Sequence, residues 1–325
     1  MNFLICDIIF VEFTVLGEVF LDIAVLYIVF NRLDTVKKVF QRIREIKPSR
    51  FYVAADAARE GVEGEVEKCN EIREYIKANV DWDCEFKTLF REKNIGCKYG
   101  VSTAIDWFFE NEEYGIILED DCFPSKDFFP FAKELLEKYK DDERIMLISG
   151  DNFQNGRKWG MGSYYFSKIC HIWGWATWRR AWKLFDIEMK AFPEFLRENK
   201  IEDVFEHPSI QWYWLKNYYR TYSGKYTSTW DYQWSFSIIN NNGLCIVPNV
   251  NLIQNIGFDG NSTHTNFNPE EYSIPTGEMK EIIHPISFIP YKKADEYEHK
   301  VHYKISLSKI RAFVRKLFSK NKIRL

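Results

Sequence analysis

The first half of the chain alternates short apolar runs with amphipathic stretches. Residues 24–30 (AVLYIVF) form a continuous apolar run rich in β-formers, which predicts a buried strand. Apolar residues then keep helical spacing from Asp34, a candidate N-cap, until Pro48. The order repeats, with strands expected at 51–55, 84–90 and 114–118 and helices at 63–79 and after Gly96. This alternation predicts an α/β fold in which a mostly parallel sheet is flanked by helices.

Charged residues follow several of these strands. Asp56 follows the second strand, Arg91 the third, and Glu119, Asp120 and Asp121 the fourth. Ligands of open parallel sheets bind beyond the carboxyl ends of the strands. Three consecutive carboxylates repel one another, and Mn²⁺ or Mg²⁺ is commonly held by carboxylates together with substrate phosphates. We therefore expect a divalent ion here; the alternative is a solvated turn in which Asp121 caps the next helix.

The regular alternation is lost after Ser149, where the chain becomes rich in Gly, Asn, Trp and Tyr up to about residue 264. Aromatic residues make up 17% of the 325 residues, more than a core of this size normally uses. This half is predicted to face the substrate. Trp173, Gly174 and Trp175, with Trp230 further on, offer flat apolar platforms for a sugar ring. The alternative for each ring is a position in the hydrophobic core.

Net charge and the spacing of the cysteines bear on nucleic-acid binding and on the cellular compartment. The 44 basic and 47 acidic side chains leave a net charge of −3, which gives no electrostatic argument for binding nucleic acid. The seven cysteines include no C-x-x-C pair, so they are interpreted as reduced thiols in a cytoplasmic protein.

Both ends of the chain differ from the rest. Acidic residues interrupt the apolar stretch at 1–30, so we predict neither a signal peptide nor a membrane anchor, and residues 1–22 are an extension of undetermined role. Residues 291–325 form a basic tail, amphipathic from Lys304 onward. Such a helix can lie peripherally on an anionic membrane surface. The alternative is a terminal helix packed on its own domain.

Seven segments occur in a characteristic order: AVLYIVFNR, YVAADAAREG, FREKNIGCKYGV, GIILEDDCFP, WGWATWRRAW, TWDYQW and NIGFDGNSTHT. This order resembles an inverting glycosyltransferase of the GT-A fold and is similar to bacterial glycosyltransferase family 2-like proteins. The ILEDD segment also resembles the N-acetylglucosaminyltransferase I family. The resemblance covers residues 24–265. It implies a Rossmann-like domain at 23–290, with a nucleotide-sugar-binding half at 23–150 and an acceptor-binding half at 151–290.

The resemblance also implies roles for individual residues. Asp121 and His264 would bind the metal ion, and Asp120 would approach the ribose of the donor. Asp56 would read the nucleotide base, and Glu119 of the acidic triplet would also bind the donor. Near the base or the diphosphate would lie Arg91, Asn94 and Gly96.

Asp231 is the candidate general base. It lies in the segment Trp230-Asp231-Tyr232-Gln233-Trp234, where burial among rings would raise the basicity of its carboxylate. The comparable stretch of N-acetylglucosaminyltransferase I-type enzymes carries two adjacent acids, whereas this chain has one.

These features together predict a metal-dependent inverting transfer of sugar from a nucleoside diphosphate sugar, UDP-linked by expectation. The acceptor would be a hydroxyl of a glycan or lipid-linked molecule in cell-surface polysaccharide synthesis. Two alternatives stay open. One is a GT-A domain that only binds a nucleotide sugar within an envelope-assembly complex. The other is a metal-dependent nucleotidyltransferase, disfavoured because G-x-x-x-x-G-K-[ST] and a D-x-D after the first strand are absent.

Overall fold

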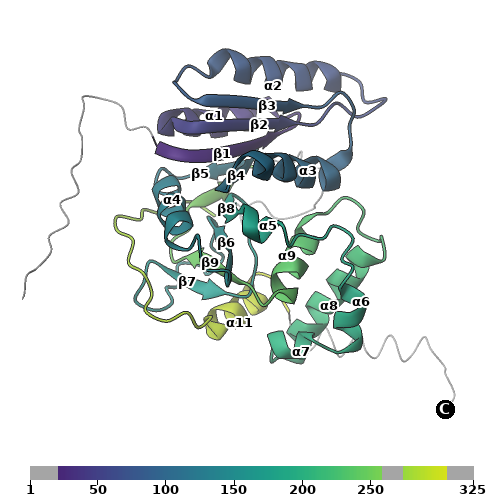
Figure 1. Ribbon diagram of the computed structural model, residues 1–325, viewed down its shortest axis with the longest axis vertical. Helices are drawn as coiled ribbons and strands as arrows, with labels where there is room; N and C mark the ends of the chain where they lie inside the picture. The colour runs from purple at the N-terminus through teal and green to yellow at the C-terminus, as the bar shows by residue number, and fades with distance from the viewer. Residues whose placement is uncertain (1–20, 258–273, 306–325) are drawn as a thin grey trace, which may run out of the picture.

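The computed structural model describes residues 21–257 and 274–305 (Figure 1). Its main sheet has the strand order β3-β2-β1-β4-β8-β6-β9-β7, and β10 pairs with β5 in a separate two-stranded sheet. The strands are β1 (Leu21–Val29), β2 (Pro48–Ala55), β3 (Glu85–Phe90), β4 (Tyr114–Glu119), β5 (Cys122–Pro124), β6 (Ile145–Ser149), β7 (Tyr164–Ser167), β8 (Trp175–Trp178), β9 (Leu244–Pro248) and β10 (Ile253–Asn255).

Most strands of the main sheet run in one direction. Strands β3, β2, β1 and β4 pair in parallel, and β6 pairs in parallel with β9. Only β7 and β8 pair in antiparallel fashion with their neighbours in this sheet, as far as the described chain extends. The predicted α/β fold with a mostly parallel sheet is therefore confirmed. The chain builds β1, β2 and β3 outward on one side and then returns to place β4 on the other side of β1. This is a topological switch point, where ligands bind in such sheets.

Helices lie on both faces of the sheet (Figure 1). They are α1 (Leu33–Ile46), α2 (Glu65–Asn79), α3 (Gly96–Asn111), α4 (Phe128–Lys138), α5 (Arg179–Trp182), α6 (Phe192–Arg197), α7 (Ile201–Val204), α8 (Pro208–Tyr222), α9 (Asp231–Asn240) and α11 (Lys292–Val301). The first helix shows why these segments fold as they do. Val36, Val39, Phe40 and Ile43 share one buried face, and Lys47 ends the helix in the left-handed conformation at φ 50°. The N-cap is Arg32 rather than the predicted Asp34, which lies in the first turn, where its negative charge favours the helix dipole.

Alternation along the central strands divides the core in two. Ile23, Val25 and Tyr27 of β1 belong to the cluster that includes α1 and α4, whereas Ala24 and Leu26 belong to the cluster that includes α3 and α9. A third cluster lies among α6, α7, α8 and α9. Burial on both faces explains why the central strands are continuous apolar runs in the sequence.

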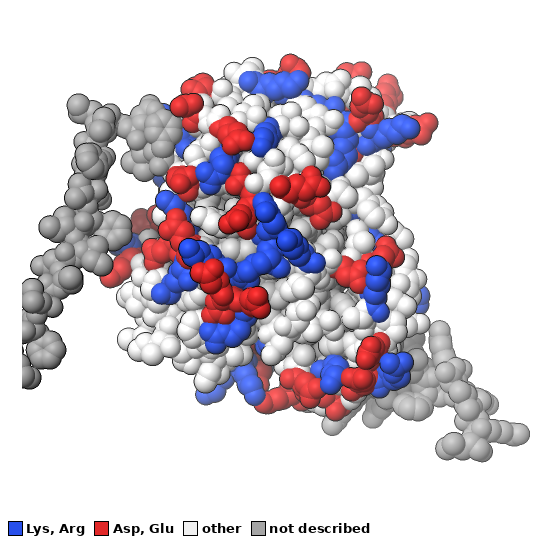
Figure 2. Space-filling view, in the orientation of Figure 1, with Lys and Arg blue, Asp and Glu red and all other residues white. Residues whose placement is uncertain are grey.

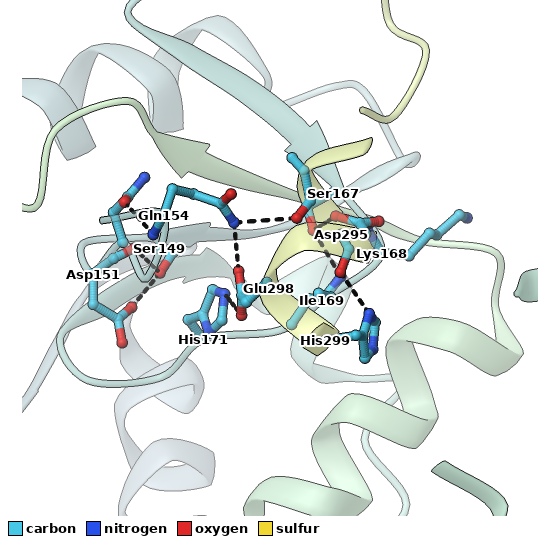
Figure 3. A network of polar contacts seen from close by, with 12 residues as sticks. Ser149, Asp151, Gln154, Ser167, Lys168, Ile169, His171, Asp295, Glu298 and His299 are labelled. Atoms are coloured by element: carbon cyan, nitrogen blue, oxygen red, sulfur yellow. Dashed lines mark hydrogen bonds and ion pairs between the residues drawn. The ribbon is translucent and has the colours of Figure 1, made fainter. Parts of the chain in front are cut away.

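Helix α11 is held against the sheet by buried charged groups (Figure 3). Glu298 is paired with His171 at 2.9 Å between Oε1 and Nε2 and accepts a hydrogen bond from Gln154 at 2.9 Å. Asp295 accepts hydrogen bonds from the Ser167 hydroxyl at 2.6 Å and from the backbone N–H of Lys168 at 3.1 Å. The first part of the predicted basic tail is thus packed into the domain in this structure.

The predicted ends of the chain lie largely outside the described residues. Strand β1 begins at Leu21, within the region predicted as an extension, and most of the amphipathic segment from Lys304 falls in 306–325, which the structure does not describe. Across 21–257 and 274–305, no helix combines the length and the apolar character needed to cross a bilayer. Figure 2 shows acidic and basic side chains interspersed over the visible face, in keeping with the small net charge.

Candidate active site

The carboxyl ends of β1 and β4 are joined by a charged cluster at the switch point. Arg32, three residues after β1, places Nη2 2.5 Å from Asp120 Oδ1 and 2.8 Å from Asp121 Oδ2. Asp120 also accepts a hydrogen bond from the backbone N–H of Phe30 at 3.3 Å. The parallel register of β1 and β4, in which Ile28 lies opposite Glu119, brings these two strand ends together. The predicted acidic triplet is thus located at the edge where a ligand of this kind of sheet binds.

The cluster holds more negative charge than Arg32 neutralises. Burial, together with Asp121 and Asp120, raises the pKa of Glu119 to about 8. Burial also raises the pKa of Asp120, although Arg32 opposes the shift. Burial disfavours the charged form of Arg32, but Asp120 and Asp121 outweigh it and raise the pKa of the guanidinium. Three carboxyl groups facing one guanidinium favour the arrival of a further cation or of protons.

Asp56 organises the turn that follows β2. Its carboxylate accepts hydrogen bonds from the backbone N–H groups of Ala57 at 3.0 Å, Ile95 at 3.1 Å and Gly96 at 3.0 Å. Gly96 has φ +76°, a conformation that L side chains rarely adopt, and begins α3. The Asn94 amide donates to the Ala57 carbonyl at 2.6 Å. Asp56, Asn94 and Gly96 are therefore brought together, and in this structure their polar groups bind the protein's own backbone.

Arg91 lies at the end of β3, as predicted, but its guanidinium is engaged by the protein. It donates to the Thr103 hydroxyl of α3 at 2.5 Å, and burial lowers its pKa, opposed by Asp56. The neighbouring Arg73 of α2 donates to the carbonyls of Asp56 at 3.0 Å and Arg91 at 2.8 Å. Arg73 therefore ties the loops after β2 and β3 to each other.

Asp231 is the first residue of α9 and faces the same region. The Thr229 hydroxyl donates to its carboxylate, and burial raises its pKa against that hydrogen bond. Asp231 also contributes to the raised pKa values of Glu119 and of the Cys97 thiol. Side chains alternate along β4, so Glu119 lies on the same face of the sheet as Ile117. Ile117 packs in one core cluster with Trp175 and with Trp230, the residue before Asp231. The structure thus brings the candidate base near Glu119, which lies 112 positions earlier in the sequence.

The predicted aromatic platform is mostly core. Trp175 is 1% exposed and Trp230 is 3% exposed, and their rings stack 5.9 Å apart at 24°. Buried to this extent, they offer almost no surface to a sugar, so the predicted stacking role does not fit their positions. Trp173 is partly exposed and packs edge-on against Phe153 at 5.2 Å. Gly174, at φ +69°, has no room for a Cβ, which would lie 2.6 Å from Ile253.

The donor set fits a divalent ion in part. Asp121 is accessible at 19% of its side chain, and the excess of carboxylates at this edge is the charge that such an ion requires. Nowhere in 21–257 or 274–305 do three His, Cys, Asp or Glu side chains form a complete metal site. His264, the second predicted ligand, lies outside the described residues. An ion here would therefore be held by Asp121 together with oxygens of a bound diphosphate.

Two residues of this site escaped the sequence prediction. Arg32 stands two residues after Phe30 in the segment AVLYIVFNR. The sequence carried no signal for its role, because only the structure shows that β1 pairs with β4. Gly257 entered the sequence analysis only as part of the segment NIGFDGNSTHT. A Cβ at Gly257 would lie 2.6 Å from Arg32 Nη1 and would clash with Asp121, so the chain passes directly over the acidic cluster here.

Comparisons with known proteins find only distant similarity. No family model matches the chain, and no curated protein matches it. Among solved structures, a mannosyltransferase from Pyrobaculum calidifontis in complex with GDP-Man and Mn²⁺ is 16% identical, with a TM-score of 0.34 over 51% of this chain and 46% of that one. S. aureus TarS is 12% identical, with a TM-score of 0.32 over 55% of this chain and 49% of that one. The chain thus spans less than half the length of either structure.

A third neighbour, mouse xyloside xylosyltransferase 1, is 11% identical, with a TM-score of 0.35 over 68% of this chain and 82% of that one. Cytidylyltransferases and sugar-nucleotide synthetases occur at similar scores. Likeness at this level carries no argument about function. The fold class rests on the strand order of this chain itself: an α/β protein with a mostly parallel sheet, a switch point between β1 and β4, and a carboxylate cluster at that point.

Proposed function

We propose that this protein is a metal-dependent inverting glycosyltransferase that uses a nucleoside diphosphate sugar. The observation that carries the proposal is the ion-paired cluster of Arg32, Asp120 and Asp121 beside the β1/β4 switch point, with Asp231 near enough to the adjoining Glu119 to help raise its pKa. A phosphate-binding centre and a separate carboxylate suited to proton removal are the two parts that such a transfer needs.

The donor would lie across the ends of β1, β2 and β4. Asp56, whose carboxylate is fixed by the N–H groups that begin α3, would read the nucleotide base, and Asp120 would approach the ribose. Arg32 offers a planar guanidinium whose remaining donors suit a phosphate. We take UDP as the first nucleotide to test.

The metal ion would be held by Asp121, completed by diphosphate oxygens and by His264. When bound, a divalent ion supplies positive charge that offsets the charge of the departing diphosphate. Arg32 adds a fixed cation to the same region, and it already bridges Asp120 and Asp121 before any ligand arrives. The site therefore needs little reorganisation as negative charge develops on the leaving group.

Asp231 would remove the acceptor proton. The acceptor oxygen forms a bond to the anomeric carbon as the bond from that carbon to the diphosphate oxygen breaks. The bonding pair leaves with the nucleoside diphosphate, and the hydroxyl proton goes to Asp231. Burial raises the pKa of Asp231, which makes it a better base than a solvated aspartate. Attack from the face opposite the diphosphate inverts the anomeric configuration.

A thermal-shift screen of UDP-, GDP- and CMP-linked sugars with Mn²⁺ tests donor binding, because a ligand at 100 times its Kd stabilises a protein by about 2.7 kcal/mol. The products of the stabilising donor then decide the chemistry. We expect free nucleoside diphosphate and a glycoside of inverted configuration. Conversion of the nucleotide sugar with added pyrophosphate into nucleoside triphosphate and sugar 1-phosphate would instead indicate a nucleotidyltransferase. Donor binding without turnover on any acceptor would indicate a binding domain.

A further inference from the structure

A basic and aromatic surface covers α8 and the loop that leads to Asp231. Each of its three cations stands over a ring: Lys216 Nζ lies 4.9 Å from the centroid of Trp212, the Arg220 guanidinium 5.2 Å from Tyr226, and Lys225 Nζ 5.9 Å from Tyr219. We call these six residues the α8 surface. Tyr219 is half exposed, so the surface combines accessible rings with positive charge.

This surface carries three basic side chains in a stretch of sequence without acidic residues. From residue 208 to residue 230 the chain contains Lys216, Arg220 and Lys225 but no Asp or Glu. None of the three cations forms an ion pair with an acidic side chain of the residues the structure describes. Lys216 and Arg220 lie one helical turn apart, a spacing at which like charges destabilise a helix. Burial, and after it Arg220, lowers the pKa of Lys216.

The arrangement is fixed by hydrogen bonds. Arg220 Nη1 donates to the Tyr226 hydroxyl at 2.8 Å, and the carbonyl of Arg220 accepts hydrogen bonds from the N–H groups of Lys225 at 2.9 Å and Tyr226 at 3.2 Å. Tyr226 in turn stacks on Tyr232, with the rings 5.8 Å apart at 17°. Tyr232 directly follows Asp231, so the α8 surface leads to the candidate base.

We propose that the α8 surface is the acceptor-binding site and that the acceptor is a saccharide carrying an anionic group, either a carboxylate or a phosphate. Exposed aromatic faces accommodate the C–H faces of sugar rings, and a guanidinium binds carboxylates and phosphates with paired hydrogen bonds. This inference rests on the proposed function, because it assigns the acceptor to the side of Asp231 away from β1 and β2.

The test measures equilibrium binding of matched saccharides to the full chain. The probes are a hyaluronan tetrasaccharide, its carboxyl-reduced neutral form, and a maltotetraose phosphorylated at one 6-hydroxyl with its unphosphorylated parent. We expect the wild type to bind one anionic probe at least about tenfold more tightly than its neutral partner, and the preferred probe identifies carboxylate or phosphate as the anion. In Arg220→Gln the preference should fall to less than about twofold.

Lys68→Gln serves as the control variant, because it removes a cation from the exposed face of α2, which lies at the opposite end of the molecule from α8 (Figure 1). It should keep the preference. Circular dichroism and melting temperature confirm that both variants fold, and UDP affinity should be unchanged in both. Tyr226→Phe, which removes only the hydroxyl that positions Arg220, should weaken the anionic probe and leave the neutral one unchanged.

Equal binding of anionic and neutral probes, or an anionic preference that survives Arg220→Gln, overturns the inference. Tight binding of a single-stranded oligonucleotide that is lost in Arg220→Gln, without saccharide binding, also overturns it and makes the surface a nucleic-acid site. Failure of the proposed function has a different signature, because nucleotide sugars would then neither bind nor turn over while the acidic saccharide still binds through Arg220.

Discussion

Arg32 Nη2 lies 2.8 Å from Asp121 Oδ2, and this ion pair joins the loop after β1 to the acidic end of β4. A protein side chain therefore supplies one positive charge at the point where the proposed donor diphosphate would lie. The excess of carboxylates around it leaves room for a second cation, so the fixed and the exchangeable charge would act together.

Replacing Arg32 tests the fixed positive charge independently of the bound cation. Arg32→Met leaves Asp120 and Asp121 without their guanidinium, and we expect it to lower the free energy of unfolding by about 1–3 kcal/mol. This is less than the roughly 3–5 kcal/mol of fully buried pairs, because Arg32 is one third exposed. Millimolar Mn²⁺ should raise the melting temperature of the variant more than that of the wild type. Arg44→Met, which breaks a surface pair with Asp81, is the control. Equal Mn²⁺ shifts would show that no ion binds these carboxylates.

Asp121 is predicted to connect the metal ion to the donor. Calorimetry should show that wild-type protein binds UDP at least about tenfold more tightly in Mn²⁺ than in EDTA. Asp121→Asn should remove that difference, since an amide is a much poorer ligand for a hard cation. Asp142→Asn, in a surface pair with Arg144, should behave as the wild type. Equal wild-type affinity in both buffers would refute metal-assisted donor binding.

Asp231→Asn distinguishes an enzyme from a binding domain. The amide is nearly isosteric, so the fold and the donor Kd should be retained, whereas transfer should fall by at least about 10²-fold because a positioned general base typically contributes 10² to 10⁴. Melting temperature, donor Kd and transfer rate are measured on one preparation. An unchanged rate would mean that water or another group accepts the proton. Losses of stability and binding in proportion to activity would make Asp231 a structural residue.

The Trp175 and Trp230 stack is expected to behave as core. Trp230→Ala should lower the free energy of unfolding by about 3–5 kcal/mol, the usual cost of deleting a buried aromatic ring. Trp173→Ala, at a partly exposed position, should cost less. Urea denaturation of both variants checks this. A Trp230→Ala protein of wild-type stability that had lost saccharide binding would restore the platform role.

Asp151, Asp295 and His171, buried beside α11, each favour a stability that falls as pH rises. Burial raises the pKa of Asp151 to about 6 and of Asp295 to about 7, so these two carboxyl groups bind more protons in the folded than in the unfolded state between about pH 4 and 7. Burial lowers the pKa of His299 to about 4, which acts in the opposite sense below about pH 6.5. Burial opposes protonation of His171, but Glu298 outweighs it and raises the His171 pKa to about 9. Stability from this ion pair is thus complete below about pH 6.5 and lost as pH rises through 9.

Melting temperatures of wild type and His171→Gln across pH 5–9.5 test this assignment. The variant should be less stable at pH 6, and the difference should shrink between pH 6.5 and 9 as the wild type loses its proton. A difference that is constant across this range would show that His171 is neutral in the folded state.

The sequence predicted the first half of the fold well because each strand is an apolar run followed by an amphipathic helix, and local pattern decides both. Strand β4 was expected at 114–118 and ends at Glu119. The second half was beyond such reasoning. Strand β8 (WATW) is four residues long and owes its place to antiparallel pairing with β4 and β6. No local pattern shows that Trp175 faces inward, because aromatic residues suit a core and a sugar site equally.

The candidate residues could be chosen from the sequence, but the contacts between them could not. Asp56, Asp121 and Asp231 were identifiable by residue type and by position after a strand or among rings. Arg32 was not, because an arginine near a helix start is usually solvated, and only the packing of β1 beside β4 brings it to the carboxylates. The α8 surface was likewise not predicted from the sequence. Only the helix shows which of its basic and aromatic side chains lie one turn apart.

The pairing of His171 with Glu298 also bears on synthesis of the chain. The two residues are 127 positions apart, so at 5–20 residues per second the ribosome needs roughly 6 to 25 s after making His171 to supply its carboxylate. During that interval His171 has no carboxylate partner, so its imidazole cannot be buried as a cation. The face of β7 and β9 that α11 covers is also still exposed. Folding of this layer is therefore deferred until α11 emerges.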